Sequence, residues 1–348
     1  MSSIENLSQA SLASTPEIDR PEQKHSWQTR LASVSIAMGA SVLGFSGVVQ
    51  SLETAQAASV VAADQNKGEA ELATQDMNRP KAMNPEQQQL WGACQALRIV
   101  NHKSTGGRGP DVNTKQWILS SFRKHDWTEL DVQSTRDHEL VHYHDYTLNA
   151  GTNGTGAIPS RTLSYIKGLR TNHGQKVGML EETAELLQHY RTKHIQLETK
   201  DYRGQWSTGE LKKQYKILDA AGVVDRVNFS SASPRVIGWF EKNHPGVYSE
   251  LIGFFDNKPS IAVAKKVKAD QINVTYKAAM SGNYTQMVHK AKKFMSIRSH
   301  PDGSGDNGFV WKWAVTKSIK GPVVQIVTQG KTKAQVCQAV VKEARKKS

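Results

Sequence analysis

From about residue 90 to the end of the chain, short apolar runs alternate with amphipathic stretches. This alternation is typical of βα units, in which parallel strands form a sheet and the helices between them cover it. Main strands are predicted at residues 97–101, 127–132, 194–199, 224–229, 251–255, 272–276, 309–316 and 323–328. Eight parallel strands are the number that closes a (β/α)8 TIM barrel. We therefore predict an α/β fold of this class over residues 89–348.

The amphipathic stretches between the strands predict the helical layer of this barrel. Helices are expected at residues 113–124, 180–191, 234–242, 261–267, 284–294 and 333–345, and a short extended return at residues 139–144. A barrel of this class takes roughly 250 residues. The 348 residues of the chain therefore fit one barrel preceded by an N-terminal extension.

The N-terminal extension has the features of a disordered export segment. Basic residues precede an apolar run at 34–49, which ends before Ala55-Gln56-Ala57, a small-residue cleavage pattern. The run is shorter and richer in Gly and Ser than a membrane-spanning helix, which is the rival interpretation. We predict a signal peptide at 1–57, a flexible linker at 58–88, and a secreted, extracellular protein, with association with the cell wall as a further option.

The formal net charge of +13 favours polyanionic partners, such as nucleic acid, an anionic membrane or a phosphate-bearing wall polymer. A solvated basic surface without a partner is the alternative. The sequence has no recognised nucleic-acid motif, so we expect no nucleic-acid binding. Of the two cysteines, Cys94 and Cys337, we expect two separately buried thiols, with a single disulfide as the alternative in an exported chain.

Three carboxylates occur on two predicted strands. Glu129 and Asp131 are two residues apart, so their side chains point to the same face, and Glu198 lies on a later strand. Leu130 and Val132 alternate with the first two, so the sequence leaves open which face is inside. If the acids face the barrel mouth, they form a hard oxygen site that suits Ca²⁺ or Mg²⁺.

Histidines and lysines follow the same predicted strands. His102 and His144 are candidates for a general acid–base pair, because imidazole titrates near neutral pH. Lys103 and Lys200 are candidates for contacts with a phosphate group. For each of these four residues a structural or solvent-exposed role is the competing interpretation.

These residues, in this order, resemble the glycerophosphodiester phosphodiesterase family, whose barrel is of the phospholipase C-like phosphodiesterase type. The resemblance is carried by 102-HKS, 110-PDVNT, 129-ELDV, 144-HD, 198-ETK and 313-WAVT, which stand where the family has H-R-G, P-E-N-T, E-x-D-V, H-D, E-x-K and W-T-V-N. It covers about residues 97–330. Any one of these motifs is weak, whereas the ordered set with sensible spacing is fairly specific.

The resemblance implies a metal-dependent hydrolysis of small glycerophosphodiesters, or of a glycerol-phosphate polymer, to glycerol 3-phosphate and an alcohol. It implies that a divalent cation is bound by Glu129, Asp131 and Glu198. It further implies acid–base catalysis by His102 and His144, phosphate binding by Lys103 and Lys200, and a substrate pocket that includes Asn113 and Trp313.

The sequence departs from the family pattern close to the first histidine. The family Arg and Gly are Lys103 and Ser104, an insertion containing Arg108 follows, and the family T-D near the end is Thr328-Gln329. Lysine presents a point charge where arginine presents a two-pronged fork, so this exchange alters how phosphate is held.

Two other functions are compatible with the same residues. A phospholipase D- or C-like enzyme acting on intact lipid would need an apolar rim at the mouth, for which Trp117, Trp239, Phe254 and Phe255 are the aromatic candidates. A catalytically weak protein that binds an anionic wall polymer is the other, and the exchanges at Lys103 and Ser104 favour it. Retention of both histidines and all three acids argues against a pure binding role.

Overall fold

The computed structural model describes residues 79–80, 82–105, 113–253, 257–299 and 304–346. The export segment at 1–57 and most of the linker at 58–88 therefore lie outside the described residues. The first helix of the described residues, α2 (Pro85–Ala96), begins within the last residues of the predicted linker, where the Asn84 side chain accepts a hydrogen bond from the Gln87 backbone N–H. Within the described part of the chain, no helix combines the length and the apolarity needed to cross a membrane.

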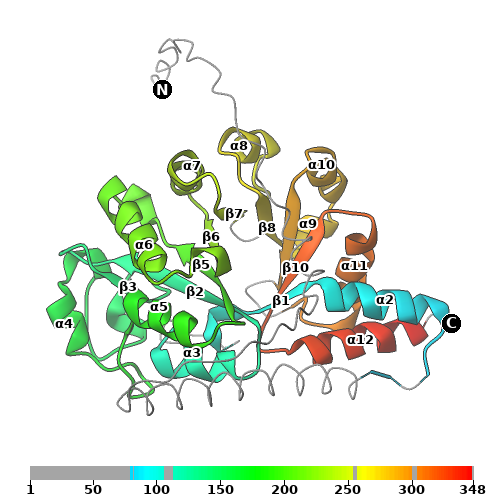
Figure 1. Cartoon of the computed structure of the whole chain (residues 1–348), viewed down its shortest axis with the longest axis horizontal. Helices are drawn as coiled ribbons and strands as arrows, with labels where there is room; N and C mark the ends of the chain where they lie inside the picture. Colours follow the sequence, from blue (N-terminus) through cyan, green and yellow to red (C-terminus); the bar gives the residue numbers. More distant parts are fainter. Residues whose placement is uncertain (1–78, 81, 106–112, 254–256, 300–303, 347–348) are drawn as a thin grey trace, which may run out of the picture. The chain divides into compact units, whose positions relative to one another are not determined.

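Eight parallel strands form a closed barrel, as predicted (Figure 1). Neighbouring strands follow the order β1-β10-β9-β8-β7-β6-β5-β2, and β1 pairs with β2 to close the ring. The barrel strands are β1 (Arg98–Asn101), β2 (Trp127–Ser134), β5 (His194–Thr199), β6 (Val227–Ser231), β7 (Tyr248–Ile252), β8 (Gln271–Thr275), β9 (Phe294–Arg298) and β10 (Val323–Thr328). Two short strands, β3 (Leu140–His142) and β4 (Gly178–Met179), extend β2 in antiparallel pairing.

Helices surround the barrel and cover its outer face. They are α3 (Lys115–Phe122), α4 (Leu163–Lys167), α5 (Leu180–His189), α6 (Thr208–Ala220), α7 (Pro234–Asn243), α8 (Ile261–Lys266), α9 (Tyr276–Met280), α10 (Tyr284–Lys290), α11 (Gly308–Ile319) and α12 (Lys333–Arg345). Single turns of 3₁₀ helix occur at η1 (His102–Ser104), η2 (Leu148–Ala150), η3 (Ile158–Ser160), η4 (Tyr202–Gly204) and η5 (Val224–Arg226).

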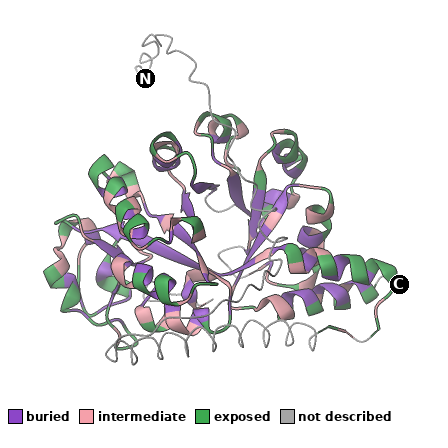
Figure 2. Ribbon diagram, viewed as in Figure 1, coloured by how far each residue is buried: buried purple, intermediate pink, exposed green. Residues whose placement is uncertain are grey.

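The hydrophobic core lies between the barrel and its helices. Outward-facing strand residues such as Leu130, Val132 and Phe229 are fully buried against helix residues such as Phe122 and Phe240. Figure 2 shows the strands mostly buried, whereas the helices are exposed on their outer sides. Because successive strand residues alternate faces, the side chains of Glu129 and Asp131 must point into the barrel. This result resolves the ambiguity that the sequence left open.

The barrel interior is polar, although branched apolar residues fill most barrels of this class. Buried side chains from five strands form a hydrogen-bonded layer around the Glu250 carboxyl of β7. Both oxygens of this carboxyl accept hydrogen bonds, and the donors are the side-chain amides of Gln196, Asn228, Gln271 and Asn273. Gln325 links the layer to β10 through the side chains of Gln196 and Ser296. Burial raises the pKa of Glu250 to about 7, and the amide hydrogen bonds offset that rise only in part.

This raised pKa predicts a pH dependence of stability. In the unfolded chain Glu250 ionises near its ordinary pKa of 4.5, whereas in the fold it ionises near 7. Its contribution is therefore fully present below about pH 4.5 and is lost as the pH rises through 7, by about 3 kcal/mol in total. Urea denaturation at pH 5 and pH 8 should show this loss in the wild type and not in Glu250→Gln. An identical pH dependence in both proteins would contradict the role given to Glu250.

The sequence-based prediction fails at two places near the end of the chain. Residues 309–316 form part of helix α11, not a strand, and the strand β9 (Phe294–Arg298) was missed. The aromatic and β-branched residues of 309–316 favour a strand locally. However, Val310, Trp311, Ala314 and Val315 are buried with the spacing of one helical face, and the Asn307 side chain caps the helix by accepting from the Val310 N–H. The predicted number of eight barrel strands is nevertheless correct, because β9 is a barrel strand and the misassigned segment is not.

The two cysteines form a disulfide, so the expectation of two free thiols is wrong. Cys94 on α2 and Cys337 on α12 are both fully buried, and their Cα atoms are 5.7 Å apart. Helices α2 and α12 pack against each other in one apolar cluster, to which both cysteines belong. Sequence spacing could not reveal this pairing, because 243 positions separate the two residues.

Candidate active site

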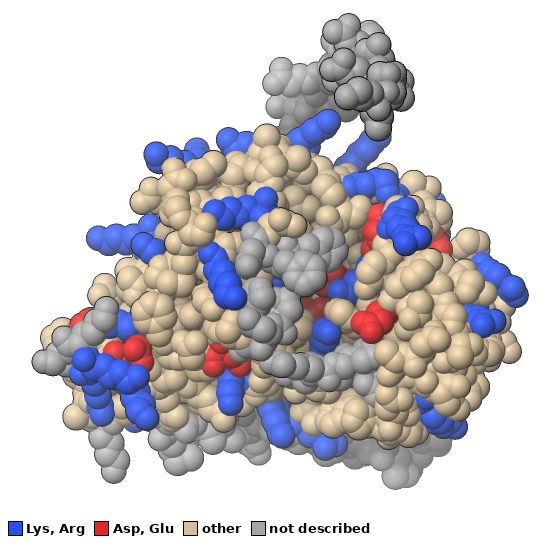
Figure 3. Space-filling model, turned by 180° about the vertical axis from the view of Figure 1, so that it is seen from behind, with Lys and Arg blue, Asp and Glu red and all other residues tan. Residues whose placement is uncertain are grey.

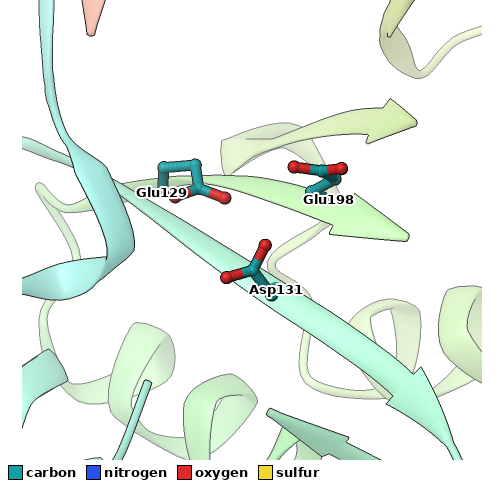
Figure 4. Close-up of side chains that lie close together, drawn as sticks. All are labelled: Glu129, Asp131 and Glu198. Atoms are coloured by element: carbon teal, nitrogen blue, oxygen red, sulfur yellow. The ribbon is translucent and has the colours of Figure 1, made fainter. Parts of the chain in front are cut away.

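Three carboxylates from two neighbouring strands meet inside the barrel (Figure 4). Asp131 of β2 lies directly beside Glu198 of β5 in the register of the sheet, and Glu129 is two residues earlier on β2. One oxygen from each of the three lies within 4.8 Å of the others. Glu129 and Asp131 are buried, while Glu198 is partly exposed. The predicted acidic residues are therefore brought together in the structure.

Lys200 lies between two of these carboxylates. Its Nζ is 2.9 Å from Asp131 Oδ1 and 2.9 Å from Glu198 Oε2. Burial would lower the pKa of Lys200, but the two carboxylates outweigh burial and raise it well above its ordinary value. Burial would raise the pKa of Asp131, but Lys200, together with the nearby His144 and Lys103, holds it well below its ordinary value. This ion pair therefore stays charged at neutral pH.

Glu129 is the least satisfied of the three carboxylates. Its Oε2 accepts a hydrogen bond of 2.8 Å from the backbone N–H of Lys103, but its buried Oε1 has no hydrogen-bond partner among the described residues. Burial and the charges of Asp131 and Glu198 raise the pKa of Glu129 well above its ordinary value. A divalent cation would relieve this repulsion and ligate the free oxygen. The donor set is all oxygen, so the three carboxylates fit Ca²⁺ or Mg²⁺.

Asn113, which the family resemblance assigned to the substrate pocket, contacts one of these carboxylates. Its Nδ2 donates a hydrogen bond of 2.7 Å to Asp131 Oδ2. Asn113 is itself buried, two residues before helix α3. With Lys200 on one oxygen of Asp131 and Asn113 on the other, the orientation of this carboxylate is fixed from both sides.

His102 follows β1 and borders the acidic cluster. Its Nε2 is 3.8 Å from Glu129 Oε2, and its Nδ1 is 3.2 Å from the side-chain amide of Gln329. Burial and the neighbouring Lys103 cation lower the pKa of His102 to about 3, even though 28% of its side chain remains exposed. The ring is therefore neutral at physiological pH.

His144 lies on the loop that follows β3. Its Nδ1 is 2.6 Å from Asp145 Oδ1, and its backbone carbonyl accepts a hydrogen bond of 2.6 Å from the Tyr202 hydroxyl. The hydrogen bond from His144 lowers the pKa of Asp145, so this carboxylate is ionised and orients the imidazole. His144 also contributes to the electrostatics of both His102 and Asp131, which places it at the same site.

The turn after β1 explains how Lys103 and Ser104 are accommodated. Both residues have positive φ angles, of 50° and 56°, in the left-handed region that favours glycine. The turn directs the Lys103 N–H at Glu129. Ser104 stands where the family pattern has glycine, so this position carries a conformational cost. Arg108, considered as a substitute for the missing guanidinium, lies outside the described residues.

Two site contacts were missed in the sequence. Gln329, directly after β10, holds His102, and its Nε2 also donates a hydrogen bond of 2.9 Å to Ser299 Oγ. Tyr202, two residues after Lys200, holds the backbone of His144. Both follow a barrel strand, where functional side chains gather in this fold, and Gln329 also stands where the family pattern has Asp.

The described aromatic candidates lie on three different helices. Trp313 is on α11, not on a strand, and packs against the apolar cluster that contains Cys94 and Cys337. Trp239 of α7 packs against the other large apolar cluster, and Trp117 of α3 contacts the ring of His173. Phe254 and Phe255 lie outside the described residues. The structure therefore does not bring these side chains together as one rim.

Figure 3 shows carboxylates gathered near the centre of one face of the molecule, with basic side chains beside them. The structure is therefore a (β/α)8 barrel whose strands β2 and β5 carry an all-oxygen site suited to a hard cation. The model of the glycerophosphoryl diester phosphodiesterase family matches residues 118–314, which is more than half of the chain. The chain belongs to this family.

Individual relatives are distant. A glycerophosphodiester phosphodiesterase of Bacillus subtilis is 34% identical over 73 residues, and the match covers 21% of this chain and only 25% of that protein. A structure of a glycerophosphodiester phosphodiesterase from Parabacteroides distasonis superposes with a TM-score of 0.58 at 16% identity, covering 72% of this chain and 98% of the other. An Oleispira antarctica phosphodiesterase in complex with sn-glycerol-3-phosphate gives a TM-score of 0.53 at 14% identity, covering 71% and 98%. The two structures show that the fold is shared.

Proposed function

We propose that this protein hydrolyses glycerophosphodiesters to glycerol 3-phosphate and an alcohol in a reaction that depends on a divalent cation. The observation that carries the proposal is the convergence of Glu129, Asp131 and Glu198 within 4.8 Å. Membership of the phosphodiesterase family supports it. The Oleispira protein of the same fold, which was crystallised with sn-glycerol-3-phosphate, points to the same product.

In this proposal the residues of the site have separate tasks. Glu129, Asp131 and Glu198 hold Ca²⁺ or Mg²⁺, which when bound supplies positive charge that stabilises the charge developing on the phosphate. Lys200, already fixed against Asp131 and Glu198, presents a second positive charge at the same place. Lys103 adds a further cation beside the turn that follows β1.

Proton transfer is assigned to the two histidines. His102 takes a proton from the attacking hydroxyl group. If that group belongs to water, glycerol 3-phosphate forms directly, and if it belongs to the glycerol, a cyclic phosphate forms first and a water molecule then opens it. His144 delivers a proton to the leaving alkoxide, because the Asp145 carboxylate at 2.6 Å stabilises its protonated form. Gln329 and Tyr202 keep the two groups in place.

Export is the second part of the proposal. A buried disulfide persists in an oxidising compartment and is rare in the cytosol. The apolar run at 34–49, followed by Ala55-Gln56-Ala57, adds an export signal at the level of sequence. Both observations favour an extracellular protein.

A coupled assay for glycerol 3-phosphate tests the reaction. We expect the full chain to release glycerol 3-phosphate from glycerophosphocholine with Ca²⁺ or Mg²⁺, and the release to stop when the cation is chelated. The variant His144→Ala should be slower by roughly 10²–10⁴-fold, the range for loss of a general acid. The exposed His189 on α5 provides the matched control, His189→Ala, which should keep full activity. Activity in the presence of chelator would refute the metal dependence.

A further inference from the structure

One sector of the helical layer is strongly basic. Residues 257–299 contain eight lysines and a single acidic residue, Asp270. That residue faces inward, because its Oδ2 accepts a hydrogen bond of 3.1 Å from the Ser249 backbone N–H. The exposed members form what is here called the lysine surface: Lys258, Lys265, Lys266, Lys268, Lys277, Lys290 and Lys292. Figure 3 shows basic side chains along the upper edge of the molecule, where Figure 1 places α7, α8 and α10.

The lysine surface extends from the barrel mouth to the opposite end. Lys258 precedes α8 on the mouth side, where its Nζ donates to the Ser281 hydroxyl at 2.7 Å and lies 5.6 Å from the centre of the Tyr284 ring. These contacts join the loop before α8 to the turn before α10. Helices of the barrel run back against the strands, so the lysines at the ends of α8 and α10 lie at the far end. The lysine surface thus has two members on the mouth side, Lys258 and Lys277, and its other members at the opposite end of the barrel.

Two of these lysines occupy backbone positions that favour glycine. Lys268 and Lys292 follow the ends of α8 and α10 with φ angles of 62° and 56°. Each ends its helix with the same pair of backbone hydrogen bonds, from Lys268 N to Lys265 O and from Ala269 N to Ala264 O at α8, with the equivalent pair at α10. Helix α6 ends with the same pattern, but there Gly222 occupies the position, at φ 65°. A left-handed conformation is strained for lysine and free for glycine.

Helix stabilisation explains only part of this charge. Lysines in a last turn interact favourably with the helix dipole, and Lys265, Lys266 and Lys290 occupy such positions. The dipole of each helix is therefore already compensated before Lys268 or Lys292 is reached. Two strained lysines added to a sector without exposed acids point to a ligand with many negative charges.

We propose that the lysine surface binds a polyanionic phosphodiester chain, namely a glycerol-phosphate polymer, whose end or branch is presented to the active site. This inference rests on the proposed function and names the substrate class. Flexible ammonium groups act as point charges without a fixed geometry, which suits a flexible chain with one charge per repeat. The affinity would come from displaced counterions and would therefore depend on salt.

The first test measures binding of the full-length protein to poly(glycerol phosphate) at increasing NaCl concentration. Lys265→Gln/Lys266→Gln/Lys268→Gln should lose affinity by roughly tenfold or more at low salt, and the slope of log Kd against log salt should fall by about 0.7 for each contact removed. The matched control removes three exposed lysines from α4 and α6, as Lys167→Gln/Lys212→Gln/Lys216→Gln. Equal losses in the two triple variants would overturn the assignment to this sector.

The second test separates binding from stability. Lys268→Gly/Lys292→Gly should weaken polymer binding while the melting temperature stays the same or rises, because both backbones favour glycine. Gly222→Lys, the reverse change at α6, should lower the melting temperature and leave polymer binding unchanged. Unchanged polymer binding in the double glycine variant would overturn the proposal, as would tighter binding to anionic lipid vesicles than to the polymer.

Kinetic measurements separate polymer binding by the lysine surface from the proposed hydrolysis. Both lysine variants should raise the KM for the polymer and leave turnover of glycerophosphocholine unchanged. If the wild type releases no glycerol 3-phosphate from either substrate but shows the expected binding pattern, polymer binding by the lysine surface is supported and the proposed reaction is refuted. If the wild type is active on both substrates and the variants do not differ from it, the surface assignment fails alone.

Discussion

The variant Asp131→Asn is expected to lose at least about 10³-fold in the rate of glycerol 3-phosphate release, since several kcal/mol of charge stabilisation depend on the bound cation. The change keeps the shape of the side chain and removes its charge. Asp131 is the carboxylate held from both sides, by Lys200 at 2.9 Å and by Asn113 at 2.7 Å. Its loss should therefore disturb the cation more than a change at the partly exposed Glu198.

Calorimetric titration with Mg²⁺ or Ca²⁺ gives the readout that does not depend on catalysis. Affinity for the cation should fall together with activity in Asp131→Asn. The exposed Asp225, close to the opposite end of the barrel before β6, supplies the matched control Asp225→Asn. Rates of Asp131→Asn within a few fold of wild type, in a protein that still melts cooperatively, would exclude Asp131 as a ligand.

Reduction of the Cys94–Cys337 disulfide is expected to lower the free energy of unfolding by about 4–5 kcal/mol, the largest single effect on stability. The reason lies in the unfolded chain, where the bond links residues 243 positions apart and removes much of the freedom of the intervening segment. The loss should be similar in Cys94→Ala/Cys337→Ala, because both side chains are buried among apolar residues.

Guanidinium denaturation with and without a thiol reductant measures this effect. The midpoint of the wild type should shift to lower denaturant when reductant is present, and that of the double alanine variant should not respond. A wild-type midpoint that ignores reductant, with reduction verified by thiol titration, would show that helix packing alone holds α2 against α12.

The barrel itself was predictable because the hydrophobic pattern of each strand and helix lies within a short segment of the sequence. The segment His194–Thr199 was predicted with its observed bounds, and so was the helix Lys333–Arg345. Both have a hydrophobic period that matches one secondary structure. The misassigned segment 309–316 has strand-forming side chains on a helical period, and only its packing against α2 and α12 decides between the two.

The residues of the candidate site were predictable where they lie on or directly after a predicted strand. Glu129, Asp131, Glu198 and His102 each lie on or directly after a barrel strand, so a correct strand assignment already gathers them at one place. The contacts that orient them are not local. Gln329 is 227 positions from His102, and Tyr202 is 58 positions from His144. Such pairings depend on how the ring of strands closes, which no short motif encodes.

The disulfide between α2 and α12 has a consequence for how the protein responds to proteolysis. It ties the first helix of the barrel to the last, so the backbone between the two cysteines becomes a covalent ring. A protease that cuts a surface loop opens this ring once but releases no fragment. Both pieces stay attached on either side of the cut and remain packed in the same barrel. A nicked molecule can thus keep its carboxylates together until a second cut or a reductant separates it.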